Sequence, residues 1–321
     1  MKGINDMANA SLHAAKDAKN DEFYTRLEDI NEEMNHYEDK FRDKVVFCNC
    51  DDPTWSNFWK YFHMNFEYLG LKKLITTHYE AGEVQTYKIE YTGGNDLDFE
   101  DGVVTPLEQN GDFRSDECVA LLDEADIVVT NPPFSLFREY VGLLLEHNKD
   151  FLIIGSMNAI KYKELFPYLK TNTFWLGNSS PKEFLQPDGT TKKFGNILWY
   201  TNLDHNKRHE TIETTYKYSK KDELYPELYP AFDELPDVIN VNKIAEIPMD
   251  YEGIMAVPIT FLDKYNPEQF EILDMLNRYT VMDYFGVNAN VQSKHSHCCN
   301  INGNPVFSRI AIRKKVGENN G

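Results

Sequence analysis

A tetrapeptide in the middle of the chain, Asn131-Pro132-Pro133-Phe134, combines residue types that can hold a planar amino group. Its two prolines fix two φ angles and lack backbone donors, so the carbonyls of Asn131 and Pro132 are presented rigidly. The Asn131 side chain adds another acceptor oxygen. These acceptors can bind both hydrogens of an exocyclic amino group and favour a nucleophilic nitrogen. Phe134 offers an apolar face on which an extruded base can stack.

The tetrapeptide also has a simpler interpretation as a loop breaker, because such combinations occur by chance. Its surroundings favour the functional interpretation. It follows the apolar run 126–130, which is typical of a buried strand, and Ser135 can cap the amphipathic helix that comes next. Adenine N6 in duplex DNA can be reached only by flipping the base out of the stack. Transfer to such a nitrogen from an activated donor needs neither a metal nor a covalent intermediate.

Carboxylates occur at two further turns. Asp112 could accept the amino hydrogens of an adenine ring that lies against Phe113, and the alternative is an aspartate that only forms the turn. Asp51 and Asp52 could bind an ammonium group, and the alternative for Asp52 is a helix N-cap. The glycine-rich turn that is usual after the first strand of a nucleotide-binding sheet is missing here. The segment Asn49-Cys50-Asp51-Asp52-Pro53 stands in its place.

These turns follow short apolar runs that predict buried strands. The runs are residues 44–50, 73–77, 103–107, 126–130 and 151–154. Between them, aromatic spacing predicts a helix from residue 53 to Gly70, and Ser115 is placed to cap another. Alternating strands and helices indicate an α/β fold with a doubly wound parallel sheet, whose ligands bind beyond the carboxyl ends of the strands. All three unusual turns fall at that edge.

The pattern weakens after residue 176. Residues 196–200 and 255–259 look like strands, and 306–315 alternates towards a strand with four basic residues. We therefore expect three regions. They are an N-terminal tail at 1–20, a catalytic domain at 21–204, and a part at 205–321 that completes the sheet and recognises the target.

The composition excludes several classes of protein. Five cysteines are too few and too unevenly spaced for a disulfide framework, and residues 1–20 lack the apolar core of a signal peptide. We expect a cytoplasmic protein without a membrane segment. The net charge of −19 counts against a general DNA-coating protein but allows a local basic cleft. Basic residues between 207 and 221 could contact phosphate or form an ordinary solvated run.

Several blocks of the sequence, in order, resemble the EcoRI-type adenine-specific DNA methyltransferases. The resemblance runs from about residue 20 to about 275 and includes the terminal strand. The blocks are 21–25, 45–53, 111–115, 126–137, 199–204, 257–262 and 266–271. In that family the turn at 49–53 replaces the glycine-rich loop. The block order is similar to the γ arrangement of amino-methyltransferases.

The resemblance implies a Rossmann-like sheet that binds S-adenosylmethionine, with a C-terminal target-recognition region. Residues 131–134 are then the catalytic loop that holds the target adenine. Tyr24 and Thr25 are implied at the methionine end of the cofactor, and Asp112 and Phe113 at its adenine. The residues implied to bind the cofactor are Tyr24, Thr25, Asn49, Asp51, Asp52, Asp112 and Phe113. Double-stranded DNA is the implied substrate, a cognate restriction endonuclease is a candidate partner, and a monomer is favoured.

The chain departs from the family at residues 179–195, which form a short segment, and at 279–304, so the recognition sequence cannot be carried over. The second segment contains Lys294-His295-Ser296-His297-Cys298-Cys299, whose spacing fits no standard zinc site. The acceptor geometry of residues 131–134 would also suit cytosine N4, RNA adenine or protein glutamine. A module that binds DNA without activity is a third alternative, which the intact tetrapeptide disfavours.

Overall fold

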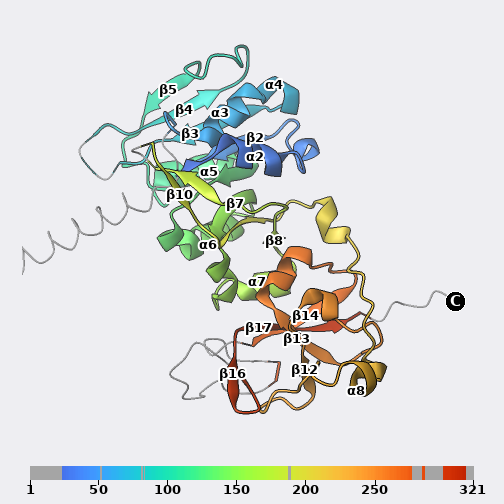
Figure 1. The fold of residues 1–321 in the computed structure, drawn as a ribbon. Coiled ribbons are helices and arrows are strands. Elements are labelled where there is room, and N and C mark those ends of the chain that lie inside the picture. The colour runs from blue at the N-terminus through green and yellow to red at the C-terminus, as the bar shows by residue number, and fades with distance from the viewer. Residues whose placement is uncertain are drawn as a thin grey trace, which may run out of the picture. The chain divides into compact units, whose positions relative to one another are not determined.

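The computed structural model divides the chain into two compact units (Figure 1). The first contains the described residues up to 157 together with 176–204, and the second contains 158–175 and the described residues from 205 onwards. The structure describes residues 24–50, 53–80, 82, 84–186, 189–276, 284–285 and 299–315. The segment 158–175 therefore groups with the C-terminal part of the chain and not with the catalytic part, where the sequence had placed it.

An eight-stranded sheet forms the framework of the first unit. Its order is β5 (Val103–Pro106), β4 (Tyr87–Tyr91), β3 (Lys73–Thr77), β2 (Val45–Cys48), β6 (Ile127–Thr130), β7 (Asp150–Ser156), β11 (Ile197–Thr201) and β8 (Trp175–Leu176). The strands β3, β2, β6 and β7 are parallel, whereas β4, β5 and β11 run antiparallel to their neighbours. Every residue of β2 and β6 is buried, which explains why both read as uninterrupted apolar runs.

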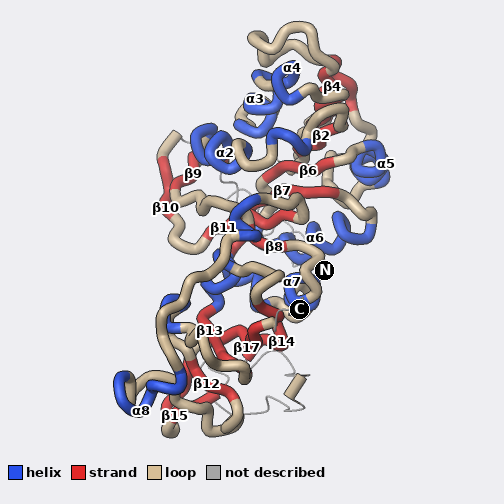
Figure 2. Tube along the Cα trace, turned by 90° about the vertical axis from the view of Figure 1, so that its right-hand side faces the viewer, coloured by secondary structure: helices blue, strands red, loops and turns tan. Residues whose placement is uncertain are grey.

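Helices cover both faces of this sheet (Figure 2). One face carries α2 (Leu27–Met34), α3 (Asn57–Met64) and α4 (Phe66–Leu69), and the other carries α5 (Asp116–Glu124) and α6 (Phe137–Glu146). The predicted α/β class and doubly wound arrangement are confirmed. The sheet is mixed, however, because antiparallel strands extend the parallel centre on both sides.

The helix predicted from residue 53 begins later than expected. Ser56 is its N-cap and accepts a hydrogen bond from the Trp59 backbone at 3.3 Å, so α3 begins at Asn57 and not at residue 53. Residues 53–55 form a turn, and Trp55, expected on the helix, lies outside it with 61% of its surface exposed. The predicted end is confirmed, since Gly70 adopts the left-handed conformation with φ of 65°.

The two predicted serine caps have different outcomes. Ser115 caps α5 by accepting from the Cys118 backbone at 3.2 Å, as expected. The cap at Ser135 is wrong, because Ser135 lies inside a short 3₁₀ helix over Phe134–Leu136. The Leu136 backbone N–H donates to the Pro133 carbonyl at 3.0 Å, and this tight turn delays the start of α6 to Phe137.

One long strand and a small separate sheet of the first unit were not anticipated. The strand β4 is only partly buried and mixes polar with apolar residues, so no clear period marks it. The short strand β1 (Tyr24–Thr25) pairs with β9 (Glu183–Leu185), which pairs with β10 (Thr191–Lys193), to give a small separate sheet. Strands of two or three residues carry too little sequence pattern to be recognised.

The second unit has a sheet of its own. Its order is β12 (Val238–Asn240), β13 (Ile254–Pro258), β17 (Arg309–Lys314) and β14 (Phe270–Leu276). The unit also contains the pair β15 (Cys299–Ile301) and β16 (Asn304–Val306) and the short helices α7 (Phe166–Lys170) and α8 (Lys221–Leu224). The prediction that residues after 204 complete the first sheet is wrong, because their apolar strands pair with one another instead.

Candidate active site

The strand order places a ligand site between β2 and β6. From β2 the chain continues to β3 on one side, whereas β6 lies on the other, so the connections leave in opposite directions. Such a switch point opens a crevice beyond the carboxyl ends of the two strands. Asn49 follows β2 and Asn131 follows β6 at this edge. Two turns that the sequence singled out therefore lie at the ends of neighbouring strands.

Threonine hydroxyls fix the strand ends at this edge. Thr76 at the end of β3 donates to the Cys48 carbonyl at 2.7 Å, and Thr130 at the end of β6 donates to the Asn49 carbonyl. These carbonyls stand where the parallel ladder stops, so side chains replace the missing backbone donors. The backbone at the end of β2 is thus held by hydrogen bonds from both neighbouring strands, β3 and β6.

The turn after β2 is anchored from the opposite face of the sheet. The Asn49 side chain is buried, and its oxygen accepts a hydrogen bond from the Tyr140 hydroxyl of α6. Burial, followed by the nearby Cys50, holds the pKa of Tyr140 well above its ordinary value, so the phenol remains a donor. Cys50 has φ of 72°, which bends the chain sharply. Asp51 and Asp52 lie outside the described residues, and their cofactor-binding role stays a prediction.

The turn that carries Asp112 packs directly on the backbone after β3. Gly111 has φ of 72°, and a Cβ atom at this position would lie 2.2 Å from the His78 carbonyl oxygen. Nearby, the Glu80 backbone donates to the Asn110 carbonyl at 3.2 Å. Glycine is therefore required by both conformation and space. This contact places Asp112 at the same sheet edge as Asn49, as the sequence predicted from strand ends alone.

Asp112 is mostly buried and bound by Arg114. Its Oδ1 accepts from the Arg114 backbone and Nε at 2.9 and 2.8 Å, and its Oδ2 accepts from Nη2 at 2.6 Å. Burial acts to raise the pKa of Asp112, but the hydrogen bonds and charge of Arg114 outweigh it and lower that pKa. The carboxylate stays ionised, and its two oxygens retain lone pairs for an amino group. Phe113 is buried, with its ring edge-on to Tyr140 at 5.0 Å.

Thr25 lies beside the start of α3. Its carbonyl accepts a hydrogen bond from the Asn57 side chain at 2.7 Å, and only 1% of the residue is exposed. The Thr25 hydroxyl oxygen is buried and has no hydrogen-bond partner among the described residues. Because an unsatisfied buried hydroxyl is costly, this one is suited to a polar ligand group. Tyr24, its neighbour in β1, is half-buried.

The tetrapeptide closes β6 as predicted. Asn131 is 8% exposed, and Pro132 is buried beside it. Within the described part of the chain no donor bonds to the Pro132 carbonyl, whereas the Pro133 carbonyl is taken by Leu136. The half-buried Phe134 ring meets Phe194 edge-on at 6.5 Å. The acceptors expected for an amino group are thus Asn131 and the Pro132 carbonyl.

Sequence reasoning missed three residues that support the site. They are Tyr140 on the helix that follows the tetrapeptide, Arg114 in the turn of Asp112, and Phe194 in a segment with no clear period. A phenol among aliphatic residues on a helix that follows the tetrapeptide was the available signal for Tyr140. The partners of Arg114 and Phe194 depend on chain folding that spacing does not reveal.

Most basic side chains between residues 207 and 221 in the second unit contact a carboxylate or an aromatic ring. Lys207 pairs with Asp263 at 2.7 Å, and Arg208 is buried with its guanidinium carbon 3.4 Å from the Trp175 ring centre. Carboxylates also pair with three other members: Glu268 with His209, Glu223 with Lys220, and Asp222 with Lys221. These contacts favour a structural or solvated role for most of the run.

The second unit also has a cavity of about 600 Å³, lined in part by Tyr218, Tyr229 and Tyr251. None of the predicted site residues lines it. Residues 294–298 of the His/Cys segment lie outside the described residues, and in the described part of the chain no group of His, Cys, Asp and Glu could hold a metal ion. Nor is any described helix long and apolar enough to span a membrane.

Comparisons with known proteins bear directly on this site. The family described as adenine-specific methyltransferase EcoRI matches residues 11–315. The type II methyltransferase M.EcoRI of Escherichia coli is 42% identical, over 96% of this chain and 97% of its own length. M.MpnI of Mycoplasma pneumoniae and M.MgeORF184P of Mycoplasma genitalium are 40% and 39% identical, each over 95% of this chain and 98% of its own length.

No solved structure matches the chain. The match to the family nevertheless spans nearly all of the sequence, including the crevice residues of the first unit and the sheet of the second. The chain therefore belongs to the EcoRI family of adenine-specific methyltransferases.

Proposed function

We propose that the protein transfers a methyl group from S-adenosylmethionine to N6 of an adenine flipped out of double-stranded DNA. The observation that carries this proposal is the position of Asn131–Phe134, at the end of β6 and beside the end of β2, at the switch point of the sheet. Family membership supports adenine as the base. When bound, S-adenosylmethionine supplies a methyl group that its sulfonium charge has already activated.

Residues of the first unit fit this cofactor. The buried Thr25 hydroxyl can bind a polar group at the methionine end, and the ionised Asp112 can accept the amino hydrogens of the cofactor's adenine. Phe113 and Tyr140 give the neighbouring turn an apolar, rigid wall. The loop that starts at Asn49 would lie between these two ends, with Asp51 and Asp52 proposed to line the pocket.

The target adenine is proposed to enter against the tetrapeptide. The Asn131 side chain and the Pro132 carbonyl accept the two amino hydrogens, which aligns the nitrogen lone pair for attack. Phe134 stacks on the base and offsets part of the cost of unstacking, which is a few kcal/mol. As the new carbon–nitrogen bond forms, the methyl–sulfur bond would break with its electron pair left on sulfur, and the nitrogen would release one of its protons to solvent.

Incubation with methyl-labelled cofactor and varied duplex DNA tests the proposal. The modified bases are then located by sequencing. Label on adenine N6 at one recurrent sequence is the expected result. Label on cytosine, on RNA or on protein, with none on DNA adenine, contradicts it. A protein that binds DNA and cofactor without any transfer would identify an inactive binding module instead.

We further propose that the protein acts in the cytoplasm as a monomer within a restriction–modification system. Its cognate restriction endonuclease would cut the same sequence when adenine is unmodified. Sedimentation of the purified chain with and without DNA tests the monomer. Cleavage of plasmid from cells with and without the methyltransferase tests the nuclease, because only unmodified plasmid should be cut.

A further inference from the structure

The hairpin of β9 and β10 joins the two ends of the proposed site. Thr25 of β1 stands opposite Phe184 of β9, which stands opposite Lys192 of β10. Residues that face each other across antiparallel strands point to the same side of the sheet. Thr25 and Phe184 are buried, so this row faces the interior of the first unit. Lys192 is the exposed end of a row that begins at a proposed cofactor ligand.

Aromatic contacts continue the row to the tetrapeptide. The Phe184 and Phe194 rings meet edge-on at 5.5 Å, and Phe194 meets Phe134 at 6.5 Å. The Lys192 ammonium lies 5.2 Å from the centre of the Phe194 ring. The Lys192 ammonium therefore contacts Phe194, and Phe194 contacts Phe134, the residue that would stack on the target base.

The hairpin is also held in place at its base. Glu33 of α2 is fully buried and accepts hydrogen bonds from the Asn178 and Ser179 backbones at 2.7 and 2.6 Å. Glu183 of β9 pairs with Arg26 at 3.2 Å and with Lys193 at 2.9 Å. The Lys193 charge is thereby offset within the hairpin. Such anchoring keeps the exposed end of β10 in a defined position relative to α2.

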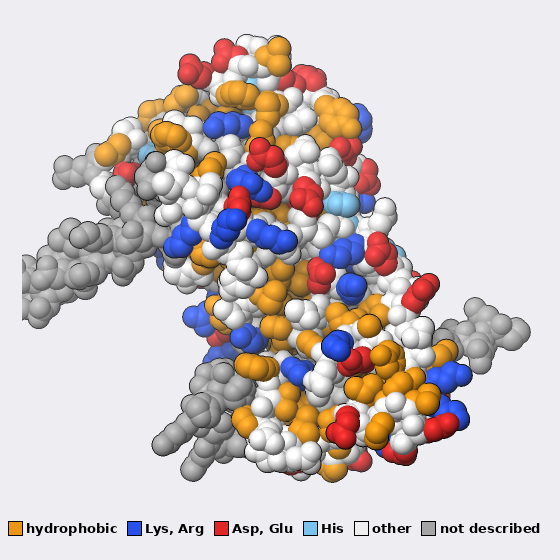
Figure 3. All heavy atoms as spheres, viewed as in Figure 1, with side chains coloured by type: hydrophobic (Ala, Val, Ile, Leu, Met, Phe, Trp, Pro, Cys, Tyr) orange, Lys and Arg blue, Asp and Glu red, His pale blue; other side chains and the backbone are white. Residues whose placement is uncertain are grey.

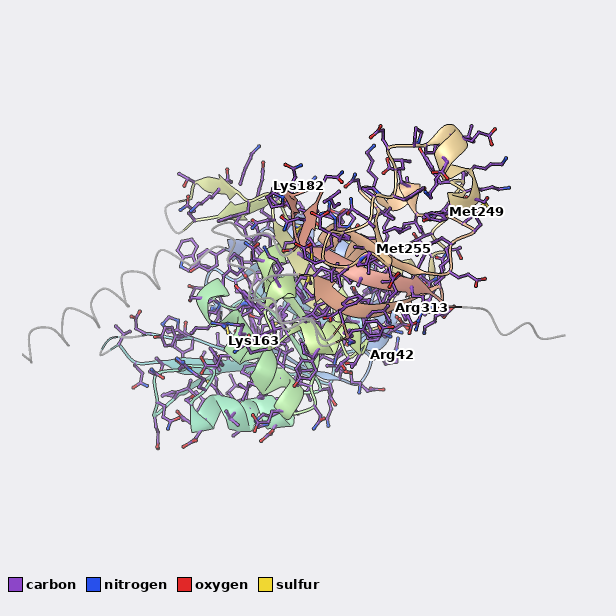
Figure 4. The ribbon with its side chains drawn as sticks, turned by 90° about the horizontal axis from the view of Figure 1, so that it is seen from below. Arg42, Lys163, Lys182, Met249, Met255 and Arg313 are labelled. Carbon is purple, nitrogen blue, oxygen red and sulfur yellow. The ribbon has the colours of Figure 1, made fainter. Side chains whose placement is uncertain are left out.

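Positive charge gathers here on an acidic protein. Lys182, labelled in Figure 4, directly precedes β9, and Lys192 and Lys193 end β10. Figure 3 shows Lys and Arg side chains over the region of this hairpin. Against a net charge of −19, a segment with three lysines and two carboxylates beside the proposed base-binding residues has the sign that DNA phosphate requires.

We propose that the β9–β10 hairpin clamps the target nucleotide, with Lys192 binding a DNA phosphate next to the flipped adenine and Phe194 supporting Phe134 from behind. This inference rests on the proposed function for the identity of the base. Lys192 is a phosphate ligand, and Phe194 is a positioning residue that acts through Phe134. Thr25 at the other end of the row connects the clamp to the cofactor side.

The salt dependence of DNA binding tests the phosphate contact. In Lys192→Gln, the slope of log affinity against log salt should fall by about one, because one fewer counterion is released. Lys72→Gln is the matched control, since Lys72 is exposed and precedes the amino end of β3, at the opposite edge of the sheet. An unchanged slope in Lys192→Gln, or an equal fall in Lys72→Gln, overturns the assignment.

Phe194 is tested by its effect on base capture. The variant Phe194→Ala should lower the single-turnover methylation rate and the fluorescence of 2-aminopurine placed at the target position. DNA and cofactor affinities should change little, and Phe194→Tyr, which keeps the ring, should restore both signals. A folding effect alone would lower the melting temperature of Phe194→Ala without changing rate or fluorescence, and that result overturns the positioning role.

The two proposals fail in distinguishable ways. If the wild-type protein methylates a base other than adenine, the proposed function fails, while the salt slope of Lys192→Gln still reports on the clamp. If adenine is methylated and the slopes of Lys192→Gln and wild type agree, the proposed function stands and the clamp is overturned.

Discussion

Asn131 is buried at the end of β6 with its side chain in the crevice-forming turn, and it is the residue on which transfer should depend most. Asn131→Ala should lower kcat by about 100-fold or more, because an acceptor for the reacting amino group is lost. Cofactor affinity, measured by calorimetry, should stay close to wild type. Asn31→Ala, at an exposed position of α2, is the control. Loss of folding in Asn131→Ala would support a purely structural role.

Arg114 should set the pH range in which Asp112 works. The folded-state pKa of Asp112 lies below its ordinary value of 3.8, so its contribution is present above 3.8 and is lost only as the pH falls through the lower value. In Arg114→Gln burial remains and raises this pKa. Cofactor affinity should then begin to fall at a pH above 3.8, as followed by calorimetric titrations at decreasing pH.

Arg42→Gln provides the comparison for that titration, since Arg42 lies before β2, at the amino end of the strand (Figure 4). If cofactor affinity falls over the same acidic pH range in wild type and in Arg114→Gln, Asp112 does not bind the cofactor's adenine.

At the residue scale, sequence identified the acceptors but not their supports. Asn131 and Asp112 stand out because each follows a strand and has chemistry that a turn does not need. Tyr140 could not be assigned in this way, because its partner Asn49 is 91 residues away and meets it only in the fold. Arg114 is only two residues from Asp112, but the sequence does not show that the turn pairs their side chains.

At the scale of elements, the turn at Gly111 should be the least tolerant glycine position near the site. Gly111→Ala brings a methyl group onto the His78 carbonyl and strains a positive φ. It should destabilise the protein by more than about 2 kcal/mol, in the upper range of single substitutions. Gly189→Ala shares the positive φ but meets no neighbour within 4 Å, so thermal melting should show a smaller loss.

Equal losses of stability in Gly111→Ala and Gly189→Ala would mean that the backbone at His78 moves to accommodate the added methyl group. The contact between Gly111 and His78 would then not fix the turn.

The sequence predicted the buried strands well and the starts of helices less well. Strands β2 and β6 are recognised by continuous burial, and Gly70 marks an end that only glycine favours. The start of α3 was misplaced because Asp52 and Ser56 are both good caps, and propensity does not choose between them. Packing decides in favour of Ser56, which lets Trp59 reach the core.

For the whole molecule, the acidic surface should keep non-specific DNA binding weak. With a net charge of −19, a random duplex should bind at the weak end of the usual range, with Kd on the order of 10⁻⁴ M at physiological salt. Fluorescence anisotropy with random duplex, compared with the duplex found by methylation mapping, measures this. Micromolar binding of random DNA would contradict the expectation and point to a larger basic face.

The division of the whole chain was the hardest feature to predict. The alternation of strands and helices reveals the first unit, but residues 158–175 carry no sign that they leave it. Their place follows from long-range contacts: α7 packs against β14, and Arg208 bonds to Asn172 at 2.6 Å. Contacts between segments so far apart in sequence have no local signature.

This split organisation constrains how the second unit could be exchanged between relatives by recombination. A chimera that swaps only residues from 205 onwards would keep α7 of one parent against β14 of the other, and it would separate Arg208 from the Trp175 on which it stacks. Two segments, 158–175 and the part after 204, must move together. An exchange of the second unit with a relative should therefore need paired crossovers, with the block that carries β11 left unchanged between them.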